Sequence, residues 1–182
     1  MTNITYTLEF YSYWHCGSGL SAGADTDALV VKDHDGLPFV PGKTIKGLVL
    51  EAAELICSLQ NCLDDQLSFL GKAGAVRSAT FFSDAVIDNE EHQKIVSSGL
   101  ASLMYDRIAS TSIDRETGVA ETGTLRSMEV VVPCLLTGTV LSIPDDKVPL
   151  VKQSLAYITG IGLRRNRGLG RCHFSVIKEE LL

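Results

Sequence analysis

The sequence has no long apolar run, no leader-like start and no excess of positive charge. Its apolar stretches fall short of the roughly 18–20 residues that a membrane-spanning helix needs. The opening residues, MTNITYTLEF, lack the basic segment and the following apolar segment of a secretion signal. We therefore expect a cytoplasmic protein without a membrane partner. Acidic residues outnumber basic ones by 22 to 16, so the formal net charge is −6.

Motifs for a structural metal and for a nucleoside triphosphate are also missing. The five cysteines include no CxxC pair. In the adjacent pairs His15-Cys16 and Cys172-His173, neighbouring side chains on a strand point to opposite faces and cannot hold one ion together. We therefore expect reduced, mostly buried thiols. The run PGKT at 41–44 looks like part of a P-loop, but GxxxxGK[ST] is not satisfied, which argues against triphosphate binding.

Hydrophobic periodicity predicts an α+β fold. Residues 4–13 alternate between apolar and polar positions, as a half-buried strand does. The order of elements predicts a ferredoxin-like or RRM-like βαββαβ palm with extra helical and loop insertions. We expect a single domain over residues 1–182 with a thumb-like insertion at about 105–127. Further strands are predicted at 79–87, 128–141 and 172–177, and helices at 90–98, at 144–158 and from an N-cap at Thr44 through Leu55 and Ile56.

Residues 159–171 form the most unusual segment, TGIGLRRNRGLGR, in which four glycines and four arginines stand without an acidic residue. Glycine lets a backbone come close to a ligand, and arginine gives bidentate contacts to phosphate. On an acidic chain, this local cluster predicts binding of a phosphate backbone, that of RNA. The alternative is a solvated, flexible turn. The predicted RNA-binding residues of this segment are Gly162, Arg164, Arg165, Arg167, Gly168 and Gly170.

Four separated blocks together carry a resemblance to a known family. In their order along nearly the whole chain, they resemble the RAMP superfamily of CRISPR effector complexes, specifically the repeated backbone subunit of type III interference complexes, which has a Gly-rich loop and an RRM-like palm. The blocks are WHCGSG (14–19) with DALVVKD (27–33) and GLPFVPGKTIKG (36–47); LG (70–71) with ATFFSDA (79–85); IDRETGVA (113–120) with LRSME (125–129); and the segment 159–171.

The resemblance implies partners and an arm that touches RNA. Copies of such a subunit polymerise along a guide RNA, so the implied partners are guide RNA, complementary target RNA, further copies of the chain and other CRISPR effector subunits. A thumb wedges into the guide–target duplex. Arg115 and Arg126 are then expected to contact phosphates, and Ile113 and Val119 to enter between bases. The alternative is a surface hairpin whose apolar residues pack back on the domain.

The resemblance also implies a catalytic aspartate in the loop after the first strand, and that position is Asp27. A carboxylate can take the proton of an attacking 2′-OH or hold a divalent metal such as Mg²⁺ or Mn²⁺. Asp25 and His15 are candidate accessory groups, and no tightly bound metal is expected. The alternative is that both carboxylates are ordinary surface residues of a loop.

Lys43 and Lys46 lie at the start of the first predicted helix. Free N–H groups and the helix dipole favour an anion there, so these lysines predict a guide-phosphate site. The alternative is an ordinary first turn with solvated lysines. For Trp14, base stacking and a core position both stand open, and Ser83-Asp84 is expected to be structural, at the base of the thumb.

Three functions follow from these observations. The first is a guide-RNA-binding backbone subunit that is also a target-RNA endoribonuclease within the assembled complex. The second is a non-catalytic, structural RNA-binding subunit in which Asp27 is inert. The third is a guide-processing endoribonuclease that uses His15 as its base, a class that usually needs two tandem ferredoxin-like domains.

Overall fold

The computed structural model describes residues 1–21, 27–60, 64–71 and 78–182. The helices in these residues are α1 (Gly42–Gln60), α2 (Asn89–Ser97) and α3 (Val148–Tyr157), with 3₁₀ turns at 64–70, 101–104, 145–147 and 165–167. None of them has the length and apolarity that crossing a bilayer requires. The strands are β1 (Thr2–Phe10), β2 (Phe81–Phe82), β3 (Tyr105–Ser110), β4 (Arg126–Val131), β5 (Leu135–Ile143) and β6 (Cys172–Leu181).

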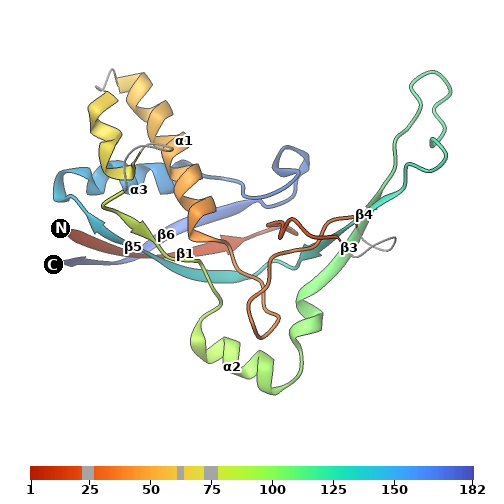
Figure 1. The fold of residues 1–182 in the computed structure, drawn as a ribbon, viewed down its shortest axis with the longest axis horizontal. Coiled ribbons are helices and arrows are strands. Elements are labelled where there is room, and N and C mark those ends of the chain that lie inside the picture. Colours follow the sequence, from red (N-terminus) through yellow and green to blue (C-terminus); the bar gives the residue numbers. More distant parts are fainter. Residues whose placement is uncertain (22–26, 61–63, 72–77) are drawn as a thin grey trace.

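The palm is a four-stranded antiparallel sheet in the order β2-β5-β1-β6. Helices α1 and α3 lie together on one face of this sheet (Figure 1). The element order β1-α1-β2-β5-α3-β6, with β1 in the interior of the sheet, is the ferredoxin-like βαββαβ arrangement. The predicted α+β palm is therefore confirmed.

The core lies between this sheet and the two helices. Side chains of β1 alternate between buried and half-buried, and Ile4, Tyr6 and Leu8 are completely buried. A Cβ on Gly138 of β5 would lie 2.4 Å from the Tyr6 Oη, so only glycine leaves room for this ring. From α1 and α3, buried residues such as Val49 face the sheet. Burying each large side chain contributes about 1.5–3 kcal/mol.

Two predicted strands were too long because the chain changes partners within them. The stretch 79–87 forms only the short β2; Ala85 then pairs with Val40, and Val86 with Thr137. The stretch 128–141 is split into β4 and β5, which belong to different sheets. Pro133 lies at the break, where it cannot donate a ladder hydrogen bond.

The N-terminus of α1 also differs from its prediction. The helix begins at Gly42, ahead of the predicted cap Thr44, and the Gly42 N–H donates to Asp84 Oδ1 at 2.7 Å. A Cβ on Gly42 would lie 2.2 Å from the Phe82 carbonyl oxygen, so the helix starts in close contact with β2. Asp84 is thus structural, as expected, but it caps α1 instead of supporting the thumb. Leu55, predicted on the core face, is 40% exposed.

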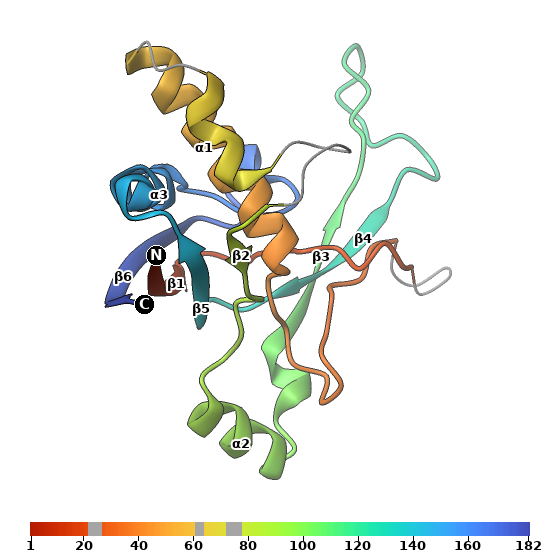
Figure 2. The same cartoon turned by 60° about the vertical axis from the view of Figure 1, so that its left-hand side comes forward.

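The arm is a hairpin of β3 and β4 that projects from the palm (Figures 1 and 2). At the palm end of this hairpin, Trp14 and Val131 exchange backbone hydrogen bonds of 2.8 and 3.1 Å. The root of the arm is defined here as the other end of the ladder, the Ala109–Ser127 and Ser110–Arg126 pairs, from which the distal loop 111–125 projects. The Trp14 ring is completely buried and stacks on Phe10 with a centroid separation of 4.4 Å. Trp14 therefore belongs to the core, and base stacking by this residue is excluded.

Candidate nucleic-acid interface

The Gly/Arg loop (residues 159–171) is fixed to the palm by backbone hydrogen bonds. The Leu163 N–H donates to the His15 carbonyl at 2.9 Å, and the Gly170 N–H donates to the Tyr13 carbonyl at 2.7 Å. Gly162 and Gly170 have positive φ, and a Cβ on either would come within 2.2 Å of a backbone oxygen. These two glycines therefore allow close packing of the loop itself. The solvated, flexible turn considered from the sequence does not describe this loop.

The arginines of the loop have different surroundings. The Arg164 guanidinium donates to Ser110 Oγ of the arm at 2.7 Å. Arg165 forms a 3.4 Å ion pair with Glu51 of α1. Within the described residues, the side chains of Arg167 and Arg171 have no hydrogen bond or ion pair. Gly168, with φ of 89°, faces open space. The outer turn around Arg167 and Gly168, together with the exposed Arg171, is thus left available to a ligand.

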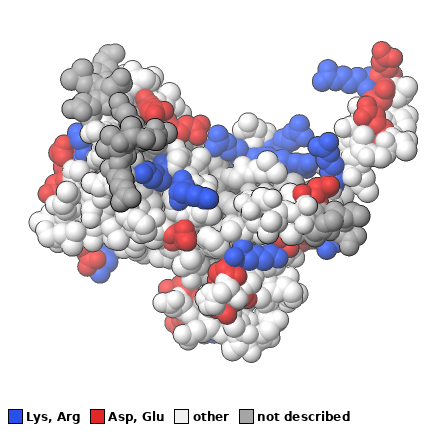
Figure 3. Space-filling model, viewed as in Figure 1, with Lys and Arg blue, Asp and Glu red and all other residues white. Residues whose placement is uncertain are grey.

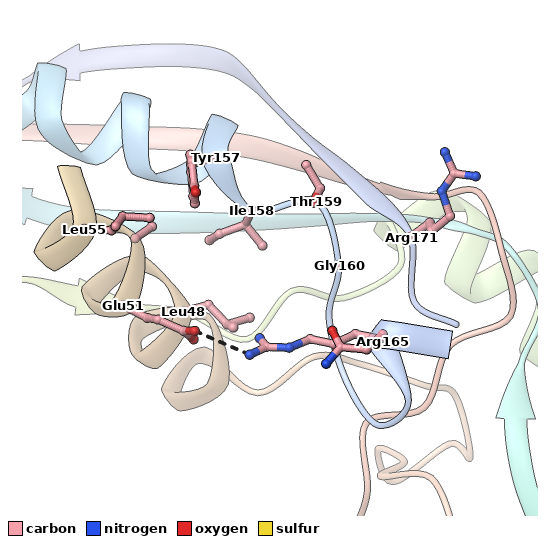
Figure 4. A pocket seen from close by; sticks show the side chains of 11 residues that line it. Leu48, Glu51, Leu55, Tyr157, Ile158, Thr159, Gly160, Arg165 and Arg171 are labelled. Atoms are coloured by element: carbon pink, nitrogen blue, oxygen red, sulfur yellow. Dashed lines mark hydrogen bonds and ion pairs between the residues drawn. The ribbon is translucent and has the colours of Figure 1, made fainter. Parts of the chain in front are cut away.

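Beside the loop, a hollow of about 720 Å³ lies between the middle of α1 and the C-terminal end of α3 (Figure 4). Leu55 and Tyr157 line it from the two helices, and the Glu51–Arg165 ion pair lies at its edge. Because Arg165 is paired there, its charge is partly neutralised by the palm. Figure 3 shows other basic side chains gathered along the edge between the helical side of the palm and the arm.

The first turn of α1 offers a narrower anion site than predicted. Asp84 takes the Gly42 N–H, and the N–H groups of Thr44 and Ile45 both donate to the Pro41 carbonyl. In the described part of the chain, the Lys43 N–H has no backbone hydrogen-bond partner, and the Lys43 side chain is exposed. Lys46 is half-buried, and neither lysine has an ion pair within the described residues. The lysine charges, more than free N–H groups, would attract a phosphate here.

Lys43 shares a hollow of about 460 Å³ with Gly162 of the Gly/Arg loop and with His15 and Gly17 of the loop after β1. The fold therefore brings together two segments that the sequence separates by more than a hundred residues. Both were predicted to bind guide RNA. Their common hollow provides one surface that a continuous phosphate backbone could follow.

Asp27 lies at the root of the arm, in a third hollow of about 380 Å³. Its N–H donates to the Ser127 carbonyl at 2.9 Å, and its Oδ2 accepts the Ser127 N–H at 2.8 Å. One carboxylate oxygen is thus held by β4, while the Asp27 side chain remains exposed. Asp25 lies outside the described residues. In the described part of the chain, no group of three or more His, Cys, Asp or Glu side chains is arranged to hold a metal.

His15 and Gly17 line both hollows, so they form the wall between the Lys43 side and the Asp27 side. His15 is 2% exposed, and its Nδ1 lies 2.7 Å from the Glu129 carbonyl oxygen. Because a carbonyl oxygen only accepts, Nδ1 carries a hydrogen and donates it. Nε2 faces Gly17, where an added Cβ would lie 3.2 Å away.

Glu129, which sequence reasoning assigned no function, holds the wall of the site together. Its Oε2 accepts the Val30 N–H at 3.0 Å, and its Oε1 pairs with Lys32 at 2.8 Å. The Lys32 ammonium also lies 3.9 Å from the centre of the Tyr105 ring. Burial, together with the nearby Glu129, raises the pKa of Tyr105. The only signal in the sequence was an acidic residue between the apolar Met128 and Val130.

The predicted wedge residues lie on the distal loop of the arm. Ile113 and Val119 are each 63% exposed, so the alternative in which they pack back on the domain is wrong. Arg115 and Arg126 are exposed and without ion pairs among the described residues. The turn between Ile113 and Val119 is held by Asp114, whose Oδ1 accepts three hydrogen bonds from Glu116 and Thr117.

Comparison with known proteins identifies the family. The model of the RAMP superfamily matches residues 7–173, which is most of the chain. The chain belongs to the RAMP superfamily. No curated protein sequence matches this RAMP protein significantly.

Solved structures that share its fold include two of the type III-B Cmr-beta. The first is a cryo-EM structure of the type III-B Cmr-beta bound to cognate target RNA. It superposes with a TM-score of 0.72 at 13% identity, and the match covers 96% of each chain. The second, the type III-B Cmr-beta in its apo state, gives a TM-score of 0.72 at 14% identity and covers 97% of both chains. At this low sequence identity, the similarity shows a shared fold and nothing further about the RAMP protein.

Proposed function

We propose that this RAMP protein is a guide-RNA-binding backbone subunit of a type III CRISPR interference complex and that it cleaves complementary target RNA. The observation that supports this function best is the position of Asp27. It lies at the root of the arm, across the His15–Gly17 wall from the hollow that Lys43 and Gly162 line. The structural neighbours include a type III-B complex bound to cognate target RNA, which favours the same setting.

In this proposal, the guide backbone lies along Lys43, Lys46 and the outer turn of the Gly/Arg loop. Arg165, Arg167 and Gly168 supply the loop's part of that surface, while Gly162 and Gly170 shape it. Lysine and arginine contacts to phosphate give affinity without reading sequence. Base pairing between guide and target then supplies the specificity. Further copies and other effector subunits complete the filament.

The exposed arm crosses the paired strands. Ile113 and Val119 enter between bases and unstack them, and Arg115 and Arg126 contact neighbouring phosphates. The displaced target nucleotide then lies against the root of the arm, where Asp27 is held. A fixed carboxylate is thereby placed beside a distorted RNA backbone. The distortion lets the 2′-oxygen, the phosphorus and the 5′-oxygen align for in-line attack.

Cleavage proceeds by attack of a 2′-OH on the adjacent phosphorus. The O2′–P bond forms, the P–O5′ bond breaks, the 2′-proton passes to a base, and the leaving 5′-oxygen takes a proton from water. Asp27 accepts the 2′-proton through the carboxylate oxygen that Ser127 does not hold. His15 borders the same hollow and is an accessory group. A divalent ion such as Mg²⁺ or Mn²⁺, held by Asp27 and RNA together, would relieve the negative charge.

A second function, a structural subunit that binds RNA without cutting it, is favoured by one observation. Asp27 Oδ2 accepts the Ser127 N–H, and this bond alone gives the carboxylate a structural purpose. A guide-processing nuclease is less well supported, because the described residues form one βαββαβ palm where that class usually has two.

The test is cleavage of labelled target RNA by the complex assembled with guide RNA and partner proteins. Asp27→Asn is the decisive variant, because an amide oxygen can still accept the Ser127 N–H while the charge is lost. We expect regularly spaced products to fall at least about a hundredfold, with target binding unchanged. Asp146→Asn, on an exposed carboxylate ahead of α3, is the matched control. Full cleavage by Asp27→Asn would leave the structural subunit as the function.

Comparing Mg²⁺, Mn²⁺ and a chelator in the same assay tests the metal. Loss of products on chelation, with target binding retained, supports a shared ion. Equal rates with and without chelator assign the proton transfer to protein groups alone.

A further inference from the structure

Arg164 differs from the other arginines of the Gly/Arg loop in its backbone. It has φ of 60° and ψ of 26°, the left-handed conformation that side chains with a Cβ adopt at a cost. Among the described residues, Ser142 is the only other non-glycine residue with positive φ. The neighbouring Gly162 and Gly168 reach positive φ without that cost. Glycine would adopt this backbone conformation at lower cost, so the presence of arginine indicates that the Arg164 side chain has a role.

The direction is toward the arm, not toward the outer surface of the loop. The Arg164 guanidinium donates to Ser110 Oγ at 2.7 Å, and the side chain is half-buried. Ser110 is the last residue of β3 and lies opposite Arg126 of β4. By contrast, Arg167 is exposed and free of ion pairs within the described residues.

The arm is therefore held on both of its strands at adjacent rungs. Ala109 pairs with Ser127, and Ser110 pairs with Arg126. Arg164 holds the β3 side through Ser110, while Asp27 holds the β4 side through Ser127. The Arg164 loop is in turn fixed to His15 through the Leu163 N–H. A continuous chain of bonds joins the loop, the root of the arm and Asp27.

We propose that Arg164 is a positioning residue that fixes the root of the arm against the Gly/Arg loop, and that it is not a phosphate ligand. The guide RNA held by the Gly/Arg loop and the target RNA backbone presented to Asp27 thereby keep a fixed position relative to each other. The cleavage readout of this inference rests on the proposed function; the position of the arm does not.

Ser110→Ala separates the two interpretations, because it removes the acceptor and changes no charge. If Arg164 positions the arm, Ser110→Ala and Arg164→Ala have the same effect, and combining them adds little. If Arg164 binds phosphate, Ser110→Ala is silent. Arg164→Gly is a third variant, which relieves the strained φ and still lacks the guanidinium. Arg167→Ala and Ser112→Ala are the matched controls for charge and for the serine side chain.

The first measurement is hydrogen exchange of the intact chain, followed over residues 105–131. We expect faster exchange at the root of the arm in Ser110→Ala, Arg164→Ala and Arg164→Gly. In the two controls, Arg167→Ala and Ser112→Ala, the exchange rate should equal that of the wild type. Unchanged exchange in the Arg164 variants overturns the proposal. This readout needs no RNA, so it remains valid if target cleavage is absent from the wild type and the proposed function fails.

The second measurement uses the complex assembled with guide RNA. Arg164→Ala and Ser110→Ala are each expected to lower single-turnover cleavage about tenfold and to blur the spacing of products, with the guide affinity and its salt dependence unchanged. Arg167→Ala should weaken guide binding and reduce the salt slope by about one. Weaker guide binding and a reduced slope in Arg164→Ala, with Ser110→Ala silent, would make Arg164 a phosphate ligand.

Discussion

The palm and the arm of this RAMP protein obtain their shapes from different interactions. The palm buries residues such as Leu8, Val49 and Val140 completely between its sheet and two helices. The distal loop of the arm, residues 111–125, has no such layer: its side chains Ile113, Val119 and Leu125 are exposed. Hydrogen bonds within the hairpin and its contacts with neighbouring segments, such as Asp27–Ser127 and Arg164–Ser110, give the arm its form. The comparison teaches that stability is concentrated in the palm, while the arm is free to present apolar side chains to a partner.

The largest expected contrast is between core truncations in the two regions. Leu8→Ala removes a completely buried side chain from the centre of the sheet and should lower the free energy of unfolding by about 2–5 kcal/mol. Ile113→Ala, on an exposed side chain, should change it by less than about 0.5 kcal/mol. Urea unfolding followed by circular dichroism measures both. A similar loss for Ile113→Ala would mean that the arm belongs to the folding core.

A second contrast lies within the Gly/Arg loop. Gly170→Ala places a Cβ 1.9 Å from the Ile161 carbonyl oxygen at positive φ and should cost roughly 2–5 kcal/mol. Gly168→Ala meets open space, so the positive φ alone should cost about 1–2 kcal/mol. Thermal unfolding of the two variants measures the difference. Equal costs would show that the loop relaxes away from the palm.

The distal turn of the arm should lose a stabilising charge in acid. Hydrogen bonds from Thr117 and Glu116 lower the pKa of Asp114, so its carboxylate stabilises the turn above the ordinary pKa range of aspartate. As the pH falls through the lowered pKa, that stabilisation is lost. NMR titration should show the Glu116 and Thr117 amides shifting at that point, while core resonances of the palm stay fixed. Asp114→Asn should abolish this titration; its persistence would assign the change elsewhere.

The smallest expected effect is in the palm. Tyr6 Oη is buried and has no hydrogen-bond partner among the described residues, and burial together with Asp84 raises the pKa of this phenol. Tyr6→Phe removes the unsatisfied hydroxyl, so stability should stay equal or rise by up to about 1 kcal/mol. Urea unfolding checks this value. A decrease in the free energy of unfolding by more than about 1 kcal/mol would mean that the Tyr6 hydroxyl has a hydrogen-bond partner in solution.

Local patterns in the sequence predicted the elements better than their limits. The alternation in β1, the periodicity of α1 and the helix predicted at 90–98 all rest on neighbours within a turn or two, and each element is present. The strand at 128–141 was predicted as one because its residues favour strand throughout; the switch from arm to palm at Pro133 depends on distant partners. Leu55 fits the helical spacing, yet no element covers it on the described surface.

The candidate site shows the same division. Lys43, Asp27, Arg167 and the thumb could be selected from the sequence because residue type and family resemblance mark them. The hydrogen bonds that position these residues could not be predicted from the sequence. Asp84 with Gly42, Glu129 with Val30, and Arg164 with Ser110 each join residues far apart in the chain.

The sequence by itself determined the palm, because a period of two on strands and of 3.6 on helices places apolar side chains on one face whatever the partner. It also determined that positive charge gathers in one loop of an acidic chain. Only the tertiary structure decided which charges remain free for a ligand. A hydrogen bond acts over about 3 Å, so the fates of Asp27 and Arg164 depend on where the arm crosses the palm.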